Sequence, residues 1–160
     1  MIEIPLTQGK FVVIDDEDVL KVIVHRWYAS KEGDVWYAKA NAVSPDGSKT
    51  CIRMHRLITG VSEPLVLVDH FNGDGLNNRR NNLRICDHAQ NLWNRGRQAN
   101  NTSGYKGVSF CKITGRWVAR IRVRGKYFNV GRYDTPELAS EAYQEASLRF
   151  HGQFAYSLRA

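Results

Sequence analysis

The stretch that decides the fold class is RWVARIRVRGKYFNVGRY, residues 116–133. Apolar and mostly basic side chains alternate through its first half, which is the pattern of a strand with one buried face. The members of the apolar face are Trp117, Ala119, Ile121 and Val123. The turn signal at 124–126 then leads into a second strand at 127–132. The stretch therefore predicts an antiparallel hairpin with one apolar and one basic face.

The flanking sequence extends this hairpin into a small domain. A further strand signal at 108–111 precedes it. Thr135, as N-cap, and Pro136, at the first helical position, start a helix whose apolar residues follow helical spacing as far as Gly152. We expect a three-stranded antiparallel sheet with one helix packed on its apolar face.

The rest of the chain mixes short strands with short helices. The expected strands cover residues 11–14, 35–38, 51–54 and 65–68, and the expected helices cover 19–24 and 88–95. Together with the C-terminal sheet and helix, this pattern predicts an α+β fold.

Basic charge is concentrated towards the C-terminus. The net charge is +7, and residues 104–160 hold ten basic and four acidic residues. Residues 104–132 contain eight basic residues and no acid. Like charges repel one another, so we interpret such a block as the footprint of a polyanionic partner. Charge alone leaves RNA or an anionic membrane open as that partner.

Composition limits the remaining classes. The chain has 160 residues, enough for one domain or two very small ones. No apolar run approaches the roughly 18 residues of a membrane helix. Residues 1–10 lack a basic region followed by an apolar core, so we expect no secretory signal. Three cysteines without a CxxC spacing argue against a disulfide scaffold or a thiolate zinc site, and favour a reducing, intracellular compartment.

The middle of the chain carries the sharpest chemical pattern. An apolar strand ends in Asp69 and His70 and leads into a polar loop; Asn82 and Asn91 follow. Hydrolysis of a phosphodiester needs a hard cation and a base, which carboxylate and amide oxygens and an imidazole can supply. Alternation points Asp69 and His70 to opposite sides, so the strand end must twist for both to serve one site.

This segment resembles the HNH endonuclease family, in its His-Asn-Asn subgroup of phage and intron-encoded homing enzymes. The resemblance rests on Met-His-Arg-Leu-Ile at 54–58, Val-Asp-His-Phe-Asn-Gly-Asp at 68–74, Asn-Asn-Leu-Arg at 81–84 and Gln-Asn at 90–91. It implies a ββα-metal fold over about residues 1–97. By the same resemblance, His70 is the general base, Asp69 and Asn91 bind Mg²⁺ or Mn²⁺, and Asn82 fastens the loop. His55 and Arg56 either bind the scissile phosphate or brace the fold.

After a polar linker at 98–104, residues 105–160 resemble the plant ethylene-response-factor, or Apetala-two, DNA-binding domain. The resemblance rests on Gly-Tyr-Lys-Gly-Val at 104–108, Trp-Val-Ala-Arg-Ile-Arg at 117–122 and Val-Gly-Arg-Tyr at 130–133. It implies that the sheet enters a DNA major groove, where arginine reads guanine and asparagine reads adenine. The candidate DNA-binding residues, from the resemblance and from the basic face, are Lys106, Ser109, Arg116, Arg120, Arg122, Arg124, Tyr127 and Asn129.

Three functions compete. The leading hypothesis is a metal-dependent DNA endonuclease, with nicking as the simplest product of a monomer. The second is a non-catalytic DNA-binding regulator with a degenerate HNH half. The third is an RNA-binding module, which the deep, narrow major groove of RNA disfavours. The leading hypothesis predicts double-stranded DNA as partner, no membrane, no required protein partner, and a place in the cytoplasm of a bacterium or phage-infected cell.

Overall fold

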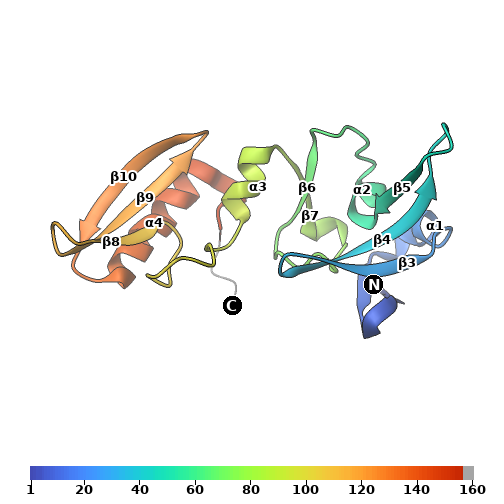
Figure 1. The fold of residues 1–160 in the computed structure, drawn as a ribbon, viewed down its shortest axis with the longest axis horizontal. Coiled ribbons are helices and arrows are strands. Elements are labelled where there is room, and N and C mark those ends of the chain that lie inside the picture. The colour runs from blue at the N-terminus through green and yellow to red at the C-terminus, as the bar shows by residue number, and fades with distance from the viewer. Residues whose placement is uncertain (157–160) are drawn as a thin grey trace. The chain divides into compact units, whose positions relative to one another are not determined.

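The computed structural model describes residues 1–156 and forms two compact units, Met1–His88 and a second unit from Ala89 onward. Both combine helices with small antiparallel sheets (Figure 1), as the α+β prediction requires. Most of the helix at 88–94 lies in the second unit, and the domain bounds expected at 97 and 105 stay a prediction. Within the described residues, no helix is long and apolar enough to cross a membrane.

The first unit contains three antiparallel sheets and two short helices. Its strands are β1 (Ile2–Pro5), β2 (Phe11–Ile14), β3 (Trp27–Glu32), β4 (Val35–Val43), β5 (Lys49–Arg53), β6 (Leu67–His70) and β7 (Leu83–Cys86). They pair as β1-β2, β3-β4-β5 and β6-β7. The helices are α1 (Val19–Val22) and α2 (Met54–Thr59). Figure 1 shows α2 between β5 and the β6-β7 hairpin.

Helix α2 is the main element that the sequence interpretation missed. The strand expected at 51–54 ends at Arg53, and Met54 begins the helix. Met54 and Ile58, one turn apart, are fully buried in the core of the unit. The helix ends at Gly60, whose φ of 71° is easily reached only without a side chain. Core burial thus stabilises a helix too short to persist alone.

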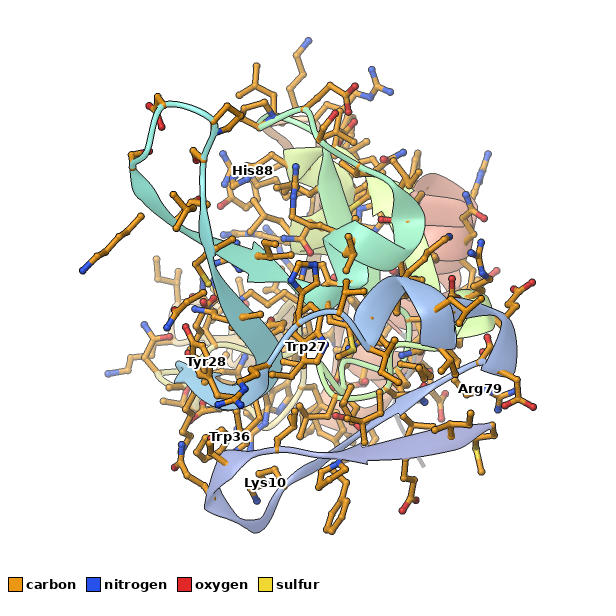
Figure 2. All side chains as sticks on the ribbon, turned by 90° about the vertical axis from the view of Figure 1, so that its right-hand side faces the viewer. Lys10, Trp27, Tyr28, Trp36, Arg79 and His88 are labelled. Carbon is orange, nitrogen blue, oxygen red and sulfur yellow. The ribbon has the colours of Figure 1, made fainter. Side chains whose placement is uncertain are left out.

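Polar and cation–π contacts fasten the N-terminal segment to the rest of this unit. The Nζ of Lys10 lies 5.3 Å from the ring centroid of Trp36 (Figure 2). The side chain of Asp18 is fully buried, and both its oxygens accept hydrogen bonds from the Arg80 guanidinium, at 2.8 and 2.6 Å. A buried carboxylate needs such a partner to offset its desolvation.

The second unit matches the elements expected of the C-terminal domain. Helix α3 (His88–Asn94) precedes β8 (Val108–Cys111), β9 (Arg116–Val123) and β10 (Lys126–Tyr133), and helix α4 spans Pro136–His151. The strands form one antiparallel sheet in the order β10-β9-β8, and α4 lies against it (Figure 1). The hydroxyl of Thr135 accepts a hydrogen bond from Leu138 N, as an N-cap should. The last four residues of the expected domain lie outside the described residues.

Helix α3 packs against other parts of the second unit. The Trp93 ring stacks on His151 of α4, with centroids 4.4 Å apart and an interplanar angle of 9°. The Lys106 ammonium donates to the carbonyls of Trp93 and Arg95, at 2.6 and 2.5 Å. A cation here satisfies carbonyls that the end of a helix leaves unpaired. We call this set of contacts the α3 clamp.

A close approach inside the second unit yields a stability test. Gly107 has φ of 73°, and a Cβ added there would meet the Tyr143 ring at 2.1 Å and the Arg120 carbonyl at 2.8 Å. Tyr143 belongs to the core and cannot give way freely. We expect Gly107→Ala to destabilise this unit by about 2–5 kcal/mol, from left-handed strain together with overpacking.

Gly115→Ala is the matched control, because Gly115 has φ of 65° but no atom within 4 Å of the added Cβ. It should cost only the strain, about 1–2 kcal/mol. The measurement is urea unfolding followed by the NMR amide signals of β8–β10. Equal losses in the two variants would contradict the close contact.

Candidate functional site

The loop between β6 and β7 is held in place by asparagine side chains. Asn82 Oδ1 accepts a hydrogen bond from Asn72 N at 3.0 Å, and Asn82 Nδ2 donates to the Asn77 carbonyl at 2.7 Å. Asp74 N donates to Asn72 Oδ1 at 2.9 Å. Asn82 therefore bridges the two sides of the loop.

The N-terminal hairpin fixes the far side of the same loop. Val13 N donates to the Leu76 carbonyl at 2.9 Å, and Asn78 N donates to the Val13 carbonyl at 2.8 Å. Asp15 accepts a hydrogen bond from Arg79 Nε at 2.9 Å. The backbone of the loop between β6 and β7 thus forms hydrogen bonds with β2. Because β2 is far away in the sequence, a local sequence pattern does not reveal this pairing.

His70 ends β6 inside an enclosed polar and aromatic environment. Its residue surface is 5% exposed, and its Nε2 lies 2.9 Å from Asn78 Oδ1. Its ring centroid lies 5.0 Å from that of His55 and 5.9 Å from that of Tyr37. Burial lowers the pKa of His70, while the Asn78 hydrogen bond opposes that shift. The imidazole is therefore neutral near pH 7, the form that can accept a proton.

Asp69 occupies a different polar environment. It pairs across the hairpin with Arg84, and the two side chains form an ion pair. The Asp69 residue is 7% exposed. Its oxygens are hard donors of the kind that Mg²⁺ or Mn²⁺ takes, so the donor chemistry fits such an ion. Any bound cation would share this carboxylate with the guanidinium of Arg84.

The described residues contain no cluster of three or more His, Cys, Asp or Glu side chains arranged to hold a metal. The second expected ligand, Asn91, is an amide on α3 and belongs to the second unit. Its pairing with Asp69 therefore stays a prediction.

The geometry favours the bracing role for Arg56. Its guanidinium donates to the carbonyls of Val66, at 2.7 Å, and Glu63, at 2.8 Å, so it holds the segment that leads into β6. His55 is buried beside Tyr37 and His70. Burial and the neighbouring His70 lower the pKa of His55 to about 3. His55 is thus a neutral, packed imidazole near pH 7, and its role at the phosphate or as a brace stays a prediction.

The outer face of the β8-β9-β10 sheet carries the expected basic surface. The register places Tyr127 opposite Arg122 and Asn129 opposite Arg120. All four side chains are exposed, and the guanidinium carbon of Arg122 lies 5.4 Å from the Tyr127 ring centroid. Ser109 is exposed on the neighbouring strand β8. These five residues form what we call the basic sheet face.

Three other candidates are placed differently. Arg116 is exposed at the start of β9 and forms a surface ion pair with Asp134, at 3.3 Å. Arg124 lies in the turn between β9 and β10, with φ of 45°. Lys106 donates to the two carbonyls of the α3 clamp, and burial lowers its pKa to about 8. This geometry gives Lys106 a structural task and counts against its predicted role in DNA binding.

The sequence interpretation assigned no role to Tyr37, Asn78 or Arg84. Arg84 stands in the Asn-Asn-Leu-Arg motif that carried the resemblance, and Tyr37 stands in the strand expected at 35–38, but the sequence does not show which residues they contact. Asn78 follows Asn77 in a run of polar residues, and nothing in the sequence distinguishes the buried member of that pair.

Comparisons with known proteins agree with this two-part arrangement. The sequence model of the AP2 domain matches residues 103–153. An APETALA2-like protein of Oryza sativa subsp. indica is 41% identical over 51 residues, which cover 32% of this chain and 12% of that protein. An uncharacterized HNH endonuclease of Acanthamoeba polyphaga mimivirus is 27% identical over 154 residues, which cover 92% of this chain and 74% of that protein.

Protein 3.8 of Escherichia phage T7 is 35% identical over 88 residues, which cover 55% of this chain and 72% of that protein. No solved structure matches the chain. The chain thus belongs to the family of phage T7 protein 3.8, and it joins an HNH-like N-terminal part to a C-terminal AP2 domain.

Proposed function

We propose that the chain is a metal-dependent DNA endonuclease, which cuts one strand per active site and grips its substrate through the AP2 domain. The observation that carries this proposal is the neutral, oriented imidazole of His70 directly after Asp69 in the motif shared with HNH enzymes. The HNH relative and the order β6-β7-α3, which is that of a ββα-metal fold, support it.

His70 acts as the general base in this proposal. Because a carbonyl oxygen can only accept, the hydrogen bond to Asn78 Oδ1 assigns the proton to Nε2 and the lone pair to Nδ1. Nδ1 then takes the proton of the attacking water. Asn82 keeps the loop that follows His70 in one conformation, so the imidazole keeps its position from one reaction cycle to the next.

Asp69 and Asn91 would hold Mg²⁺ or Mn²⁺ through oxygen atoms. When bound, such an ion neutralises charge that develops on the phosphate oxygens. Without metal or DNA, the Arg84 guanidinium neutralises the charge of the Asp69 carboxylate. Affinity for the metal should therefore be low until a DNA phosphate adds further ligands.

The basic sheet face supplies affinity and register on duplex DNA. Arg120 and Arg122 alternate with buried Ala119 and Ile121, so their guanidinium groups project from the same side of β9. Asn129 stands opposite Arg120 in the register. Exposed arginine and asparagine on a sheet suit base edges in the major groove.

Removing the base should abolish cleavage but not binding. We expect His70→Ala to reduce the nicking rate by about 10²–10⁴-fold, the usual loss for a general base. The measurement is nicking of supercoiled plasmid with Mg²⁺ or Mn²⁺, beside anisotropy titrations of a labelled duplex. His88→Ala, at an exposed histidine, is the control and should keep the parental rate. Parental nicking by a folded His70→Ala protein would show that another group is the base.

Activity should depend on a weakly held hard metal. We expect EDTA to stop nicking, Mg²⁺ or Mn²⁺ to restore it, and calorimetry without DNA to detect only weak metal binding. Asn91→Ala should raise the metal concentration needed for half-maximal activity, whereas Asn100→Ala, at an exposed asparagine, should not. Full activity in EDTA, or tightly retained zinc with no response to Mg²⁺ or Mn²⁺, would contradict this assignment and favour the regulator.

Binding should depend on particular arginines and not on charge alone. If Arg120 makes a bidentate base contact, Arg120→Ala should cost about 1–3 kcal/mol, a loss of about 5- to 150-fold in affinity. The probe is a duplex enriched from a random library by the parent protein. Arg149→Ala removes the same charge from an exposed position on α4 and should change affinity little. Equal losses for the two variants, on every sequence, would indicate general electrostatic attraction instead.

A further inference from the structure

Asn78 is the one asparagine of the β6-β7 loop with no exposed surface and a side-chain contact to His70. Its backbone is pinned by the hydrogen bond from Asn78 N to the Val13 carbonyl, so the side chain is presented from a fixed point. Asn82, in contrast, uses its amide on the backbone of Asn72 and Asn77. The two asparagines therefore have different roles: Asn82 holds the loop, and Asn78 contacts the His70 ring.

The burial of Asn78 has a cost that its oxygen must offset. Its Nδ2 finds no hydrogen-bond partner among the described residues, although it is shielded from solvent. A buried donor without a partner destabilises a fold, and a leucine of similar shape would remove that penalty. The hydrogen bond between Asn78 Oδ1 and His70 Nε2, at 2.9 Å, explains why an amide stands at this position.

The surroundings of His70 leave its ring little freedom to reorient. The His55 and Tyr37 rings lie against it at centroid distances of 5.0 and 5.9 Å. A ring held on its sides and bonded at Nε2 has one tautomer and one orientation.

We propose that Asn78 is the positioning residue of the site, which fixes His70 as its Nε2–H tautomer and so directs the basic Nδ1 at the reacting group. This inference rests on the proposed role of His70 as base. Asn78 acts through His70 and touches no substrate. Loss of its oxygen should leave DNA affinity unchanged and slow the chemical step.

The test measures the tautomer directly in the full-length chain. Long-range ¹H–¹⁵N spectra of histidine-labelled protein distinguish Nε2–H from Nδ1–H. We expect the parent to show His70 as the Nε2–H form alone, and Asn78→Leu to show a mixture or the Nδ1–H form. Asn78→Asp keeps an acceptor at the same place and should keep the Nε2–H form. Asn81→Leu and Asn81→Asp, at an exposed neighbouring asparagine, are the matched controls and should match the parent.

Nicking assays give the second readout. Asn78→Leu should lower the single-turnover rate by at least about tenfold with unchanged affinity for duplex DNA, as second-sphere partners of catalytic groups commonly do. A parent with Nδ1–H at His70, or an Asn78→Leu protein with an unaltered tautomer, overturns the positioning role. If the parent fails to nick any DNA while the tautomer responds as expected, the nuclease proposal fails and the role of Asn78 in holding the ring stands.

Discussion

The candidate site of the first unit depends on one constraint: the loop between β6 and β7, which buries Gly75 and Asn78, must find backbone hydrogen-bond partners without regular secondary structure. Side-chain amides supply part of the answer, since Asn82 bridges Asn72 and Asn77. The edge of β2 supplies another part through Val13. Because these partners are distant in sequence, the loop takes its shape only when the N-terminal hairpin is in place. His70 enters this loop, and its orientation depends on the same set of bonds.

The sequence predicted the second unit far better than the first, for a physical reason. In β9 each side chain faces either the core or solvent, so alternation alone identifies the strand, its apolar face and the arginine face; the bounds Val108–Cys111 and Arg116–Val123 were correct. Thr135 and Gly152 mark the ends of α4 by local chemistry. Helix α2 escaped prediction because only tertiary burial of Met54 and Ile58 stabilises it. Asn78 escaped because its burial depends on a hairpin more than sixty residues earlier, a separation no local pattern carries.

The two candidate sites use opposite physical conditions. Around His70 and His55, removal of water keeps imidazoles uncharged and geometry fixed, which suits proton transfer. On the basic sheet face, Arg120, Arg122 and Tyr127 are exposed to water, so the charges of the two arginines act at long range and are screened by salt. The residues around His70 and those of the basic sheet face are different residues. Substitutions can therefore alter proton transfer and DNA attraction separately.

The α3 clamp bears on how this protein could be divided or recombined. The similarity to AP2 domains begins at residue 103, yet the Trp93 ring already stacks on His151 and the Arg95 carbonyl already accepts from Lys106, all within the second unit. A cut at the polar stretch 98–104 would leave the first piece ending in a helix with an uncovered indole. The second piece would keep the partly buried Lys106 ammonium without the Trp93 and Arg95 carbonyls that accept its hydrogen bonds. The smallest complete structural unit at this end of the chain is therefore longer than the stretch that matches the AP2 sequence model, and it begins with α3.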